Sequence, residues 1–378
     1  MHIPFAASPR SSIGVEWELA LVDADSGDLR QVAATVLEAV APPGGGEHPT
    51  IKQELLLNTV EIITGVCRTV PEAGADLQRS IDTIREVTDP LRVELMCAGT
   101  HPFARWSNQK VTDKQRYATL IDRTQWWGRQ MLIYGVHVHV GIEDRRKVLP
   151  ILRAVLTYFP HLQSLSASSP FWGGKDTGYA SNRALMFQQL PTAGLPFQFD
   201  EWEQLEAYTA DMMHTGVIDQ FDEIRWDLRP SPRLGTLEMR ICDGASNLTE
   251  VMAFAALIHC LVEHFSTMLD EGKQLPKLQP WFAQENKWRS ARYGMDAIII
   301  LDAQGNEELV TEAVPRLLAE LEPVADRLGC AAELDGVRTI LRKGASYQRQ
   351  RAVARRNGGE LDSVVAALVA EMRAGKPL

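Results

Sequence analysis

Hydrophobic and polar residues alternate along Ser11–Asp23, whose sequence is SSIGVEWELALVD. Successive side chains of a β-strand point to opposite faces, so the odd-numbered positions from Ile13 to Leu21 form an apolar face that can pack on a core. Glu16 and Glu18 share the other face, about 7 Å apart in an extended strand. Two carboxylates on a partly covered face repel each other and lose hydration. That face is therefore either open to water or occupied by a divalent cation such as Mg²⁺ or Mn²⁺, which suits carboxylate oxygens.

Further segments show strand patterns or the periodicity of amphipathic helices. Strands and helices do not alternate strictly, which favours an α+β fold with one antiparallel sheet, helices on one face and a site on the other. No change in composition marks a boundary, so we predict a single domain over residues 1–378, helical from about residue 305. The predicted strands are Ile13–Asp23, Glu54–Gly65, Leu95–Gly99, Val136–Gly141, Ile224–Arg229, Thr236–Cys242 and Ala297–Leu301, and the predicted helices are Val32–Ala41, Ala73–Val87, Lys114–Met131, Arg146–Phe159, Asp200–Met213, Leu248–Leu269, Glu308–Leu328, Ala331–Arg342 and Leu361–Arg373.

Two of these strands repeat the arrangement of an aliphatic face opposite a polar face. GVHVHVG places His137 and His139 together, and a histidine pair at this spacing either binds a metal ion or makes ordinary hydrogen bonds. GTLEMRICDG places Glu238 and Arg240 together, and these two side chains either pair with each other or belong to a larger site.

The segment QELLLNTVEIITG holds Glu54 and Glu61 in an apolar setting. Residues seven positions apart point to opposite faces of a regular strand. Both carboxylates can therefore belong to one site only if a bulge or a turn near Asn58 interrupts the strand.

Four strand segments thus place acids or imidazoles opposite an aliphatic face, which predicts one shared carboxylate-lined surface. Such a surface can hold two or three divalent ions and, through them, a polyphosphate, because Mg²⁺ is usually shared between carboxylates and phosphate oxygens. The long loop Ser168–Arg183 is of a kind that often carries function. Five arginines beside aromatic or glycine-rich segments either bind phosphates and carboxylates or only interact with solvent. They are Arg183, Arg229, Arg240, Arg289 and Arg292.

The composition narrows the class of protein. A formal net charge of -10 disfavours sequence-independent binding to nucleic acid. Five scattered cysteines without a C-x-x-C pair indicate reduced thiols in a cytoplasmic protein. We expect no signal peptide and no membrane span, because the chain has no suitable apolar run. No phosphate-loop or dinucleotide-binding motif is present, so metals and arginines on a sheet would have to hold any nucleotide.

Several long motifs resemble one bacterial family. They are GVEWELALVD, VEIITG, GVHVHVG, DTGYASNRALMFQQLPTAGLP, RWDLRPSPRLGTLEMRICD and ENKWRSARYGMDA, and they run in order from about Ile13 to beyond Ala297. These motifs resemble the bacterial carboxylate–amine ligases, the glutamate–cysteine ligase type 2 family. The resemblance implies a fold similar to glutamine synthetase and the guanidino kinases. In that fold a curved antiparallel sheet of about six strands forms a cradle, with helices on its outer face and ATP and divalent metals inside.

The resemblance also implies a reaction. The side-chain carboxylate of glutamate, or of a similar acid, attacks the γ-phosphate of ATP, and an amine, typically that of cysteine, then attacks the acyl phosphate. We therefore expect small-molecule substrates, no nucleic acid or membrane partner, and a homodimer as the commonest assembly. The alternatives are a phosphotransferase of the same fold without an amine step, a two-metal hydrolase, and a non-catalytic protein that binds a nucleotide or an amino acid.

Each role implied by the resemblance falls on a matched motif. The carboxylates and one histidine are implied as ligands of Mg²⁺ or Mn²⁺, and the arginines as groups that face phosphates or the substrate carboxylate. The loop residues Tyr179 and Arg183 are implied to close over the amino-acid substrate. The implied metal ligands are Glu16, Glu18, Glu54, Glu61, His137 and Glu238; the implied catalytic arginines are Arg229, Arg240 and Arg292; the implied ATP- or substrate-binding residues are Tyr179, Arg183 and Arg289.

Overall fold

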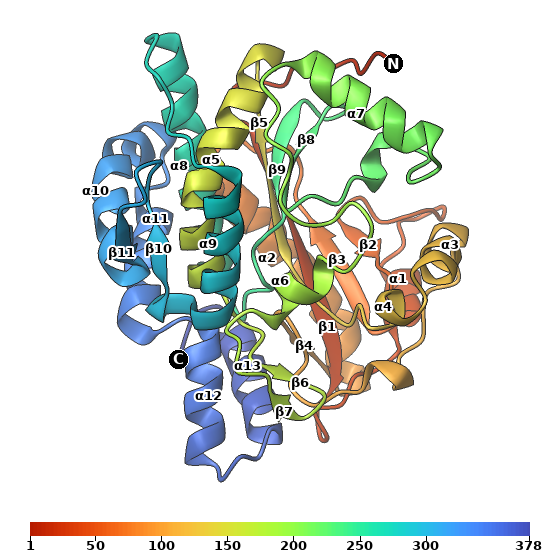
Figure 1. The fold of residues 1–378 in the computed structure, drawn as a ribbon. Coiled ribbons are helices and arrows are strands. Elements are labelled where there is room, and N and C mark those ends of the chain that lie inside the picture. The colour runs from red at the N-terminus through yellow and green to blue at the C-terminus, as the bar shows by residue number, and fades with distance from the viewer.

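A seven-stranded antiparallel sheet lies at the centre of the computed structural model, which describes residues 1–378 (Figure 1). The strands follow the order β2-β3-β1-β5-β9-β8, and β4 pairs with the second half of β1. This confirms the predicted α+β class with an antiparallel sheet of about six strands. The strands are β1 (Ile13–Asp23), β2 (Ile51–Gln53), β3 (Thr59–Ile63), β4 (Val93–Met96), β5 (Val136–Gly141), β8 (Leu228–Ser231) and β9 (Thr236–Met239).

The central strand β1 has the two faces that its alternation predicts. Its odd-numbered side chains, such as Val15 and Trp17, are buried in the core, whereas Glu16 and Glu18 remain partly exposed on the other face. The register of the sheet places Glu16 opposite His137 of β5 and Glu18 opposite Glu61 of β3. The polar positions of three strands therefore meet on one face.

The predicted interruption near Asn58 is present as a turn between two strands. Residues 54–58 connect β2 to β3, and these two strands pair antiparallel, with Lys52 opposite Glu61. Glu54 directly follows the last residue of β2 and lies outside β3. The face to which its side chain points is therefore not fixed by the alternation of side chains along β3. Both carboxylates can therefore reach the same face of the sheet.

Helices cover the apolar face of the sheet. Helix α2 packs against β1, β3 and β4, and α8 packs against β5 and against α2. Asn247 begins α8 by accepting a hydrogen bond from the Glu250 amide at 3.0 Å, as a helix N-cap does. One cluster of 91 buried hydrophobic residues extends from Ile3 to Met372. The helices before residue 305 are α1 (Ala33–Ala39), α2 (Val70–Thr88), α3 (Gln115–Thr124), α4 (Trp126–Arg129), α5 (Arg145–Ser166), α6 (Asn182–Phe187), α7 (Trp202–His214), α8 (Leu248–Asp270) and α9 (Pro280–Tyr293).

The C-terminal part of the chain is helical, from residue 310 onward. Figure 1 shows these helices beside α8 and below it, away from the β2 edge of the sheet. Helix α11 packs against α8, and α13 packs against β4. The helices are α10 (Val310–Leu328), α11 (Ala331–Lys343), α12 (Ser346–Arg356) and α13 (Asp362–Ala374).

Helix α8 is long and apolar enough to span a membrane by length and composition alone. The sequence predicts no membrane span because Leu248–Asp270 contains polar residues between its apolar ones, and this helix passes the test by length and average composition only. Most of the apolar window, 78%, is buried inside the protein, because α8 packs against the sheet and against α5, α10 and α11. Its hydrophobicity is thus that of a central core helix.

Other elements differ from the prediction in detail. The helix expected over Lys114–Met131 is broken between α3 and α4 at Gln125, whose φ of 46° lies in the left-handed region. The strand expected at Ala297–Leu301 is β10 (Ile298–Ile300), but it pairs with β11 (Glu307–Leu309) in a separate two-stranded sheet. Helices α6 and α9 were not predicted, and α12 lies in the part predicted to be helical from about residue 305, although its bounds were not predicted.

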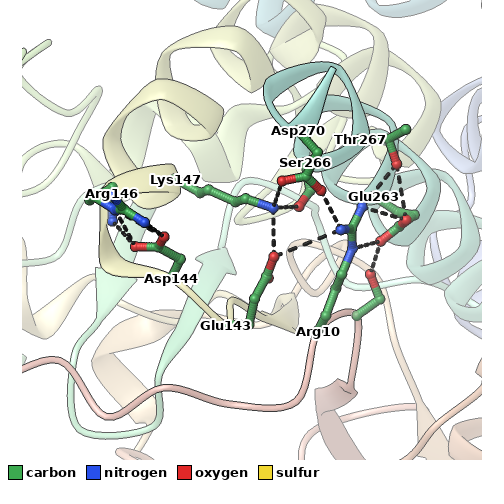
Figure 2. Close-up of polar contacts among 10 residues, drawn as sticks. Arg10, Glu143, Asp144, Arg146, Lys147, Glu263, Ser266, Thr267 and Asp270 are labelled. Carbon is green, nitrogen blue, oxygen red and sulfur yellow. Dashed lines mark hydrogen bonds and ion pairs between the residues drawn. The ribbon is translucent and has the colours of Figure 1, made fainter. Parts of the chain in front are cut away.

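An ionic network fixes the N-terminal segment before it enters β1. Figure 2 shows Arg10 between two acids of α8, with Glu263 Oε2 at 2.9 Å from its Nε and Asp270 Oδ2 at 2.5 Å from its Nη1. Lys147 of α5 joins the same network through Asp270 and Glu143, each at 2.6 Å from its Nζ. The network ties the start of β1 to the two long core helices.

Candidate active site

The six side chains implied as metal ligands converge on the polar face of the sheet in two groups. In each group, one potential ligand atom of every residue lies within 4.8 Å of the others. We name them the histidine group and the acidic group. The histidine group is Glu16, His137 and Glu238, and the acidic group is Glu18, Glu54 and Glu61.

Charges within the histidine group are already balanced by neighbours. Glu16 contacts His137 Nδ1 at 3.0 Å and His139 Nε2 at 3.2 Å. Glu238 is fully buried and accepts a hydrogen bond from Arg229 Nε at 2.6 Å and another from Arg240. Every residue of this group therefore has a polar partner.

The pKa values of the two carboxyl groups reflect this balance. Burial opposes ionisation of Glu16, but the hydrogen bonds to His137 and His139 hold its pKa well below the usual value. Burial likewise opposes ionisation of Glu238, but the charges of Arg240 and Arg229 lower its pKa. Both carboxylates are thus anionic at neutral pH without further help.

The acidic group lacks such compensation, since no lysine, arginine or histidine forms a salt bridge with any of its members. Glu18 accepts a hydrogen bond from the Gly135 amide at 2.6 Å, and Glu54 from the Leu55 amide at 2.8 Å. Burial, followed by the charge of Glu54, raises the pKa of Glu18 to about 8. Burial and the three neighbouring glutamates raise the pKa of Glu61 well above its usual value. Three carboxylates in this arrangement require either protons or a cation.

The donor chemistry of both groups fits hard divalent ions. Three carboxylates offer only oxygen ligands, which Mg²⁺ and Mn²⁺ prefer, and Mg²⁺ commonly combines one or two carboxylates with substrate phosphates. The histidine group offers carboxylate oxygens and one imidazole, but both oxygens of Glu238 already contact arginines. Metal binding by Glu238 would therefore be shared with Arg229 and Arg240.

Two arginines at the site keep a nitrogen without a partner. The Nε atoms of Arg183 and Arg240 are buried and make no hydrogen bond. Arg183 Nη1 donates to the carbonyl oxygens of Arg240 and Ile241 at 3.3 and 3.4 Å. Both guanidinium groups also lie over the ring of Phe187, 5.8 and 5.9 Å from its centre. Unpaired buried donors of this kind are suited to an anionic ligand.

A glycine makes room for Arg183. A Cβ atom on Gly135, the first residue of GVHVHVG, would lie 2.2 Å from Arg183 Nη2. Gly135 also donates its amide to Glu18. Gly135 thus lies between the guanidinium group of Arg183 and the acidic group, where only a residue without a side chain fits.

Three of the predicted site residues lie elsewhere. Arg289 pairs with Glu285 on α9 and with Glu307 on β11, and it contacts none of the six ligand-type side chains. Arg292 donates to the carbonyl oxygen of Gly178 and lies over the ring of Tyr179 at 5.6 Å. The structure therefore places Arg292 against the loop Ser168–Arg183, to which Tyr179 belongs. It leaves Arg289 in a surface ion pair.

The loop Ser168–Arg183 contains a short hairpin, β6 (Phe171–Trp172) and β7 (Lys175–Asp176), and is anchored by a buried acid that sequence reasoning missed. Asp243, just after β9, accepts hydrogen bonds from the Ser168 amide at 3.0 Å, Ser169 Oγ at 2.6 Å and Ser181 Oγ at 2.8 Å. These contacts hold both ends of the loop. A single aspartate next to a strand gives no periodic signal, so only the fold reveals its role.

A second residue missed from the sequence is Arg116 on α3. Its charge acts on Glu54 and Glu61, and its guanidinium group bonds to the hydroxyl of Tyr117, which in turn lies 3.4 Å from the carbonyl oxygen of Gln53. Helix α3 therefore brings a cation towards the acidic group from outside the sheet.

Comparison with known proteins gives one family over nearly the whole chain. The profile of Glutamate-cysteine ligase family 2 (GCS2) matches residues 12–367. "Putative glutamate--cysteine ligase 2-1" of Arthrobacter sp. (strain FB24) is 62% identical over 99% of both chains. A relative with the same kind of name from Mycobacterium tuberculosis (strain ATCC 25177 / H37Ra) is 58% identical over 98% of this chain and 97% of its own.

Solved structures show the same fold at low sequence identity. Glutamate–cysteine ligase of Francisella tularensis in complex with AMP has a TM-score of 0.68 at 13% identity, covering 98% of this chain and 90% of its own. A bifunctional glutathione synthetase of Pasteurella multocida has a TM-score of 0.64 at 16% identity, covering 96% of this chain and 51% of its own. With the family profile and the close relatives, these findings confirm the resemblance read from the motifs: the chain belongs to glutamate–cysteine ligase family 2.

Proposed function

We propose that this protein is an ATP-dependent ligase that joins the carboxylate of glutamate, or of a similar acid, to an amine such as that of cysteine. Family membership and the names of its relatives support this reaction class. The observation that carries the proposal is the convergence of six ligand-type side chains from four distant segments on one face of the sheet. The AMP bound to the Francisella ligase supports a nucleotide as one of the substrates.

The acidic group and the histidine group are the proposed sites of Mg²⁺ or Mn²⁺. When bound, such ions join carboxylates to phosphate oxygens and offset the charge on the phosphoryl group. Glu18, Glu54 and Glu61 are the strongest candidates, because they lie close together without a cationic partner. Glu16 and His137 offer the next available donors, and Glu238 shares its oxygens with two arginines.

Arg183 and Arg240 would bind the anionic parts of the substrates. Each has a free buried Nε–H group, and charged donors in a site from which water is excluded stabilise negative charge that develops during reaction. No side chain of the protein has to act as a nucleophile, since the substrate carboxylate itself attacks the phosphorus atom. The protein's task is to position two anions in line and to neutralise them.

The loop Ser168–Arg183 is the proposed shield of the acyl phosphate. An acyl phosphate reacts with water, so the amine can use it only in a closed site. The loop carries Arg183 at one end and is held through Ser168, Ser169 and Ser181 by Asp243. Arg292 supports it from α9 through the Gly178 carbonyl.

Product analysis tests the reaction. The purified protein is incubated with Mg-ATP, glutamate and a panel of amines that includes cysteine, and both ADP and the mass of the product are followed. We expect ADP to form together with an amide when the correct amine is present. Formation of a phosphorylated acid at the same rate without any amine would instead identify a phosphotransferase, and ATP-independent hydrolysis would identify a hydrolase.

Replacing one proposed ligand tests the role of the site. We expect Glu16→Gln to lower kcat at least 100-fold, because it removes a charge on which the proposed ion and both histidines depend. Glu312→Gln is the matched control, since Glu312 is exposed on α10 and its side chain forms no hydrogen bond or salt bridge there. A folded Glu16→Gln protein with normal turnover would contradict the proposal.

The cellular setting is a separate part of the proposal. All five cysteines are free and buried, as expected for a protein kept under reducing conditions. We infer a cytoplasmic enzyme with small-molecule substrates, and its assembly as a homodimer stays a prediction.

A further inference from the structure

The C-terminal helices line a cavity of about 970 Å³ that is open to solvent on one side and shares no residue with the candidate active site. It lies along one side of α12 and is completed by the end of α11 and by α13. Its size is that of a pocket for a nucleotide-sized molecule and not for a single ion.

Cations surround this cavity, although the protein as a whole has a formal net charge of -10. One of the five, Arg349, is partly buried and neutralised by Glu250 and Glu371 at 2.8 Å each. The other four form no salt bridge. Asp296 brings the only unpaired acidic side chain to the lining. The four unpaired cations are Arg342, Lys343, Arg355 and Arg356.

The position of each cation in its helix has an ordinary explanation, but their convergence does not. Arg342 and Lys343 lie in the last turn of α11, and Arg355 and Arg356 in the last turn of α12, where positive charge offsets the helix dipole. The dipole does not require two helix ends to place their cations around one hollow. Like charges around a shared cavity repel, so the arrangement gains stability when an anion enters it.

The remaining wall of the cavity is apolar or small. Leu341, Ala352, Val353, Ala367 and Ala370 face it between the cationic residues. A ligand that satisfies both surfaces combines several negative charges with an apolar or flat group. Inorganic phosphate would use only the cationic part.

We propose that this cavity is a second ligand site, which binds a nucleotide-like polyanion: several phosphates attached to a flat apolar group. The phosphates would contact Arg355, Arg356 and the end of α11, and the flat group would lie on the alanine and valine wall. The acids that line the cavity are Asp296 and Glu371, and Glu371 is already paired with Arg349, so binding here requires no divalent ion. This property separates the cavity from the candidate active site, where acids would repel a free polyphosphate.

Calorimetric titration of the full-length protein with ATP in excess EDTA tests the proposal. We expect one ATP per chain, and weaker binding as the salt concentration rises. Arg355→Ala/Arg356→Ala should weaken this binding at least 10-fold. The matched control is Arg316→Ala/Arg338→Ala, which removes the same charge from arginines of α10 and α11 outside the cavity.

Three outcomes would overturn the inference. They are no binding of ATP without metal, an equal loss of affinity in both double variants, and a binding footprint by hydrogen exchange that avoids α12 and α13. Tripolyphosphate is the second probe, and binding as tight as that of ATP would refute a role for the apolar wall. None of these results depends on ligase activity, so they leave the proposed function untouched.

Discussion

At the scale of single residues, the three carboxylates of the acidic group favour binding of a metal ion but lower the stability of the metal-free fold. Glu18 is the clearest case, because burial and the charge of Glu54 raise its pKa to about 8. A carboxyl group whose pKa is raised by folding stabilises the folded state while it is protonated, and this contribution is lost as the pH rises from the ordinary value of 4.5 through 8. A metal ion that prefers the carboxylate would reverse this loss.

We therefore expect metal-free Glu18→Gln protein to be more stable than the unaltered protein at pH 8 and equally stable near pH 4.5. Thermal unfolding in EDTA measures this difference, which should grow steadily with pH to about 2 °C or more. Adding Mg²⁺ should raise the melting temperature of the unaltered protein and reduce the advantage of the variant. A difference that does not depend on pH would show that Glu18 is ionised at no cost.

Gly135 offers a test of Arg183 without changing a charge. In Gly135→Ala the new Cβ would collide with the guanidinium group at 2.2 Å, so Arg183 has to move from its contacts with the Arg240 and Ile241 carbonyls. We expect kcat/KM for ATP to fall at least 10-fold while the protein stays folded, since the phosphates lose a positioned donor. Gly14→Ala is the matched control on the same sheet, because its Cβ would meet nothing closer than 3.8 Å. Equal activities of the two variants would contradict a role for Arg183.

At the scale of helices and strands, α12 holds the loop Ser168–Arg183 by its side opposite the cationic cavity. Arg351 binds both carboxylate oxygens of Asp176, at 2.9 and 2.6 Å, and Gln350 donates to the carbonyl oxygen of Ser168 at 2.8 Å. The hairpin β6–β7 is also held by Phe171, which is buried and accepts a hydrogen bond from Thr100 Oγ1 at 2.7 Å. The position of the loop thus depends in part on a helix that is far away in the sequence.

We expect Arg351→Ala to loosen the loop without unfolding the protein. Faster hydrogen exchange across β6 and β7 would report the loosening. The rate of ADP formation should then exceed that of amide formation, since water reaches the acyl phosphate. Arg327→Ala serves as the control, as Arg327 is exposed on α10, lies outside the cavity and makes no contact with the loop. Unchanged coupling of ADP to amide in Arg351→Ala would show that the hairpin closes without this anchor.

Prediction from the sequence succeeded where the alternation of apolar and polar residues fitted only one kind of element, a strand with one buried face. The polar faces of β1 and β5 followed directly from IGVEWELALVD and VHVHVG. The division of the ligands into two groups could not be predicted, because it depends on the strand order β3-β1-β5-β9. The bounds of helix α12 were missed because SYQRQRAVARR has no wide apolar stripe, and the left-handed Gln125 broke a helix whose periodicity continues on both sides. The displaced Arg289 shows that a matching motif does not fix the contacts of one side chain.

At the scale of the whole molecule, the segment before β1 is attached to the core by salt bridges and hydrogen bonds of its side chains. Arg10 contacts Glu263, Asp270 and Thr267 of α8, while Ser11 Oγ lies 2.5 Å from Glu263. Single exposed ion pairs contribute little, but a shared network can stabilise a chain end. The network therefore belongs to the stability of the fold rather than to the chemistry of the site.

We expect Arg10→Ala to destabilise the protein by about 1 kcal/mol, with kcat unchanged at low temperature. Chemical denaturation measures the loss, which should shrink at high salt as the charges are screened. Arg68→Ala, an exposed arginine without a salt bridge, is the control. A loss of activity without a loss of stability would place Arg10 in the chemistry of the protein.

The anchoring of the loop by α12 also has a consequence for the synthesis of the protein on the ribosome. The sheet and all six ligand-type residues are complete once the chain has been synthesised to Met239, but the helix that holds the loop begins only at Ser346. A nascent polypeptide that still lacks α12 would carry the proposed metal-binding face without a secured cover. Synthesis of α12, rather than folding of the sheet, would then mark the moment at which productive turnover can begin.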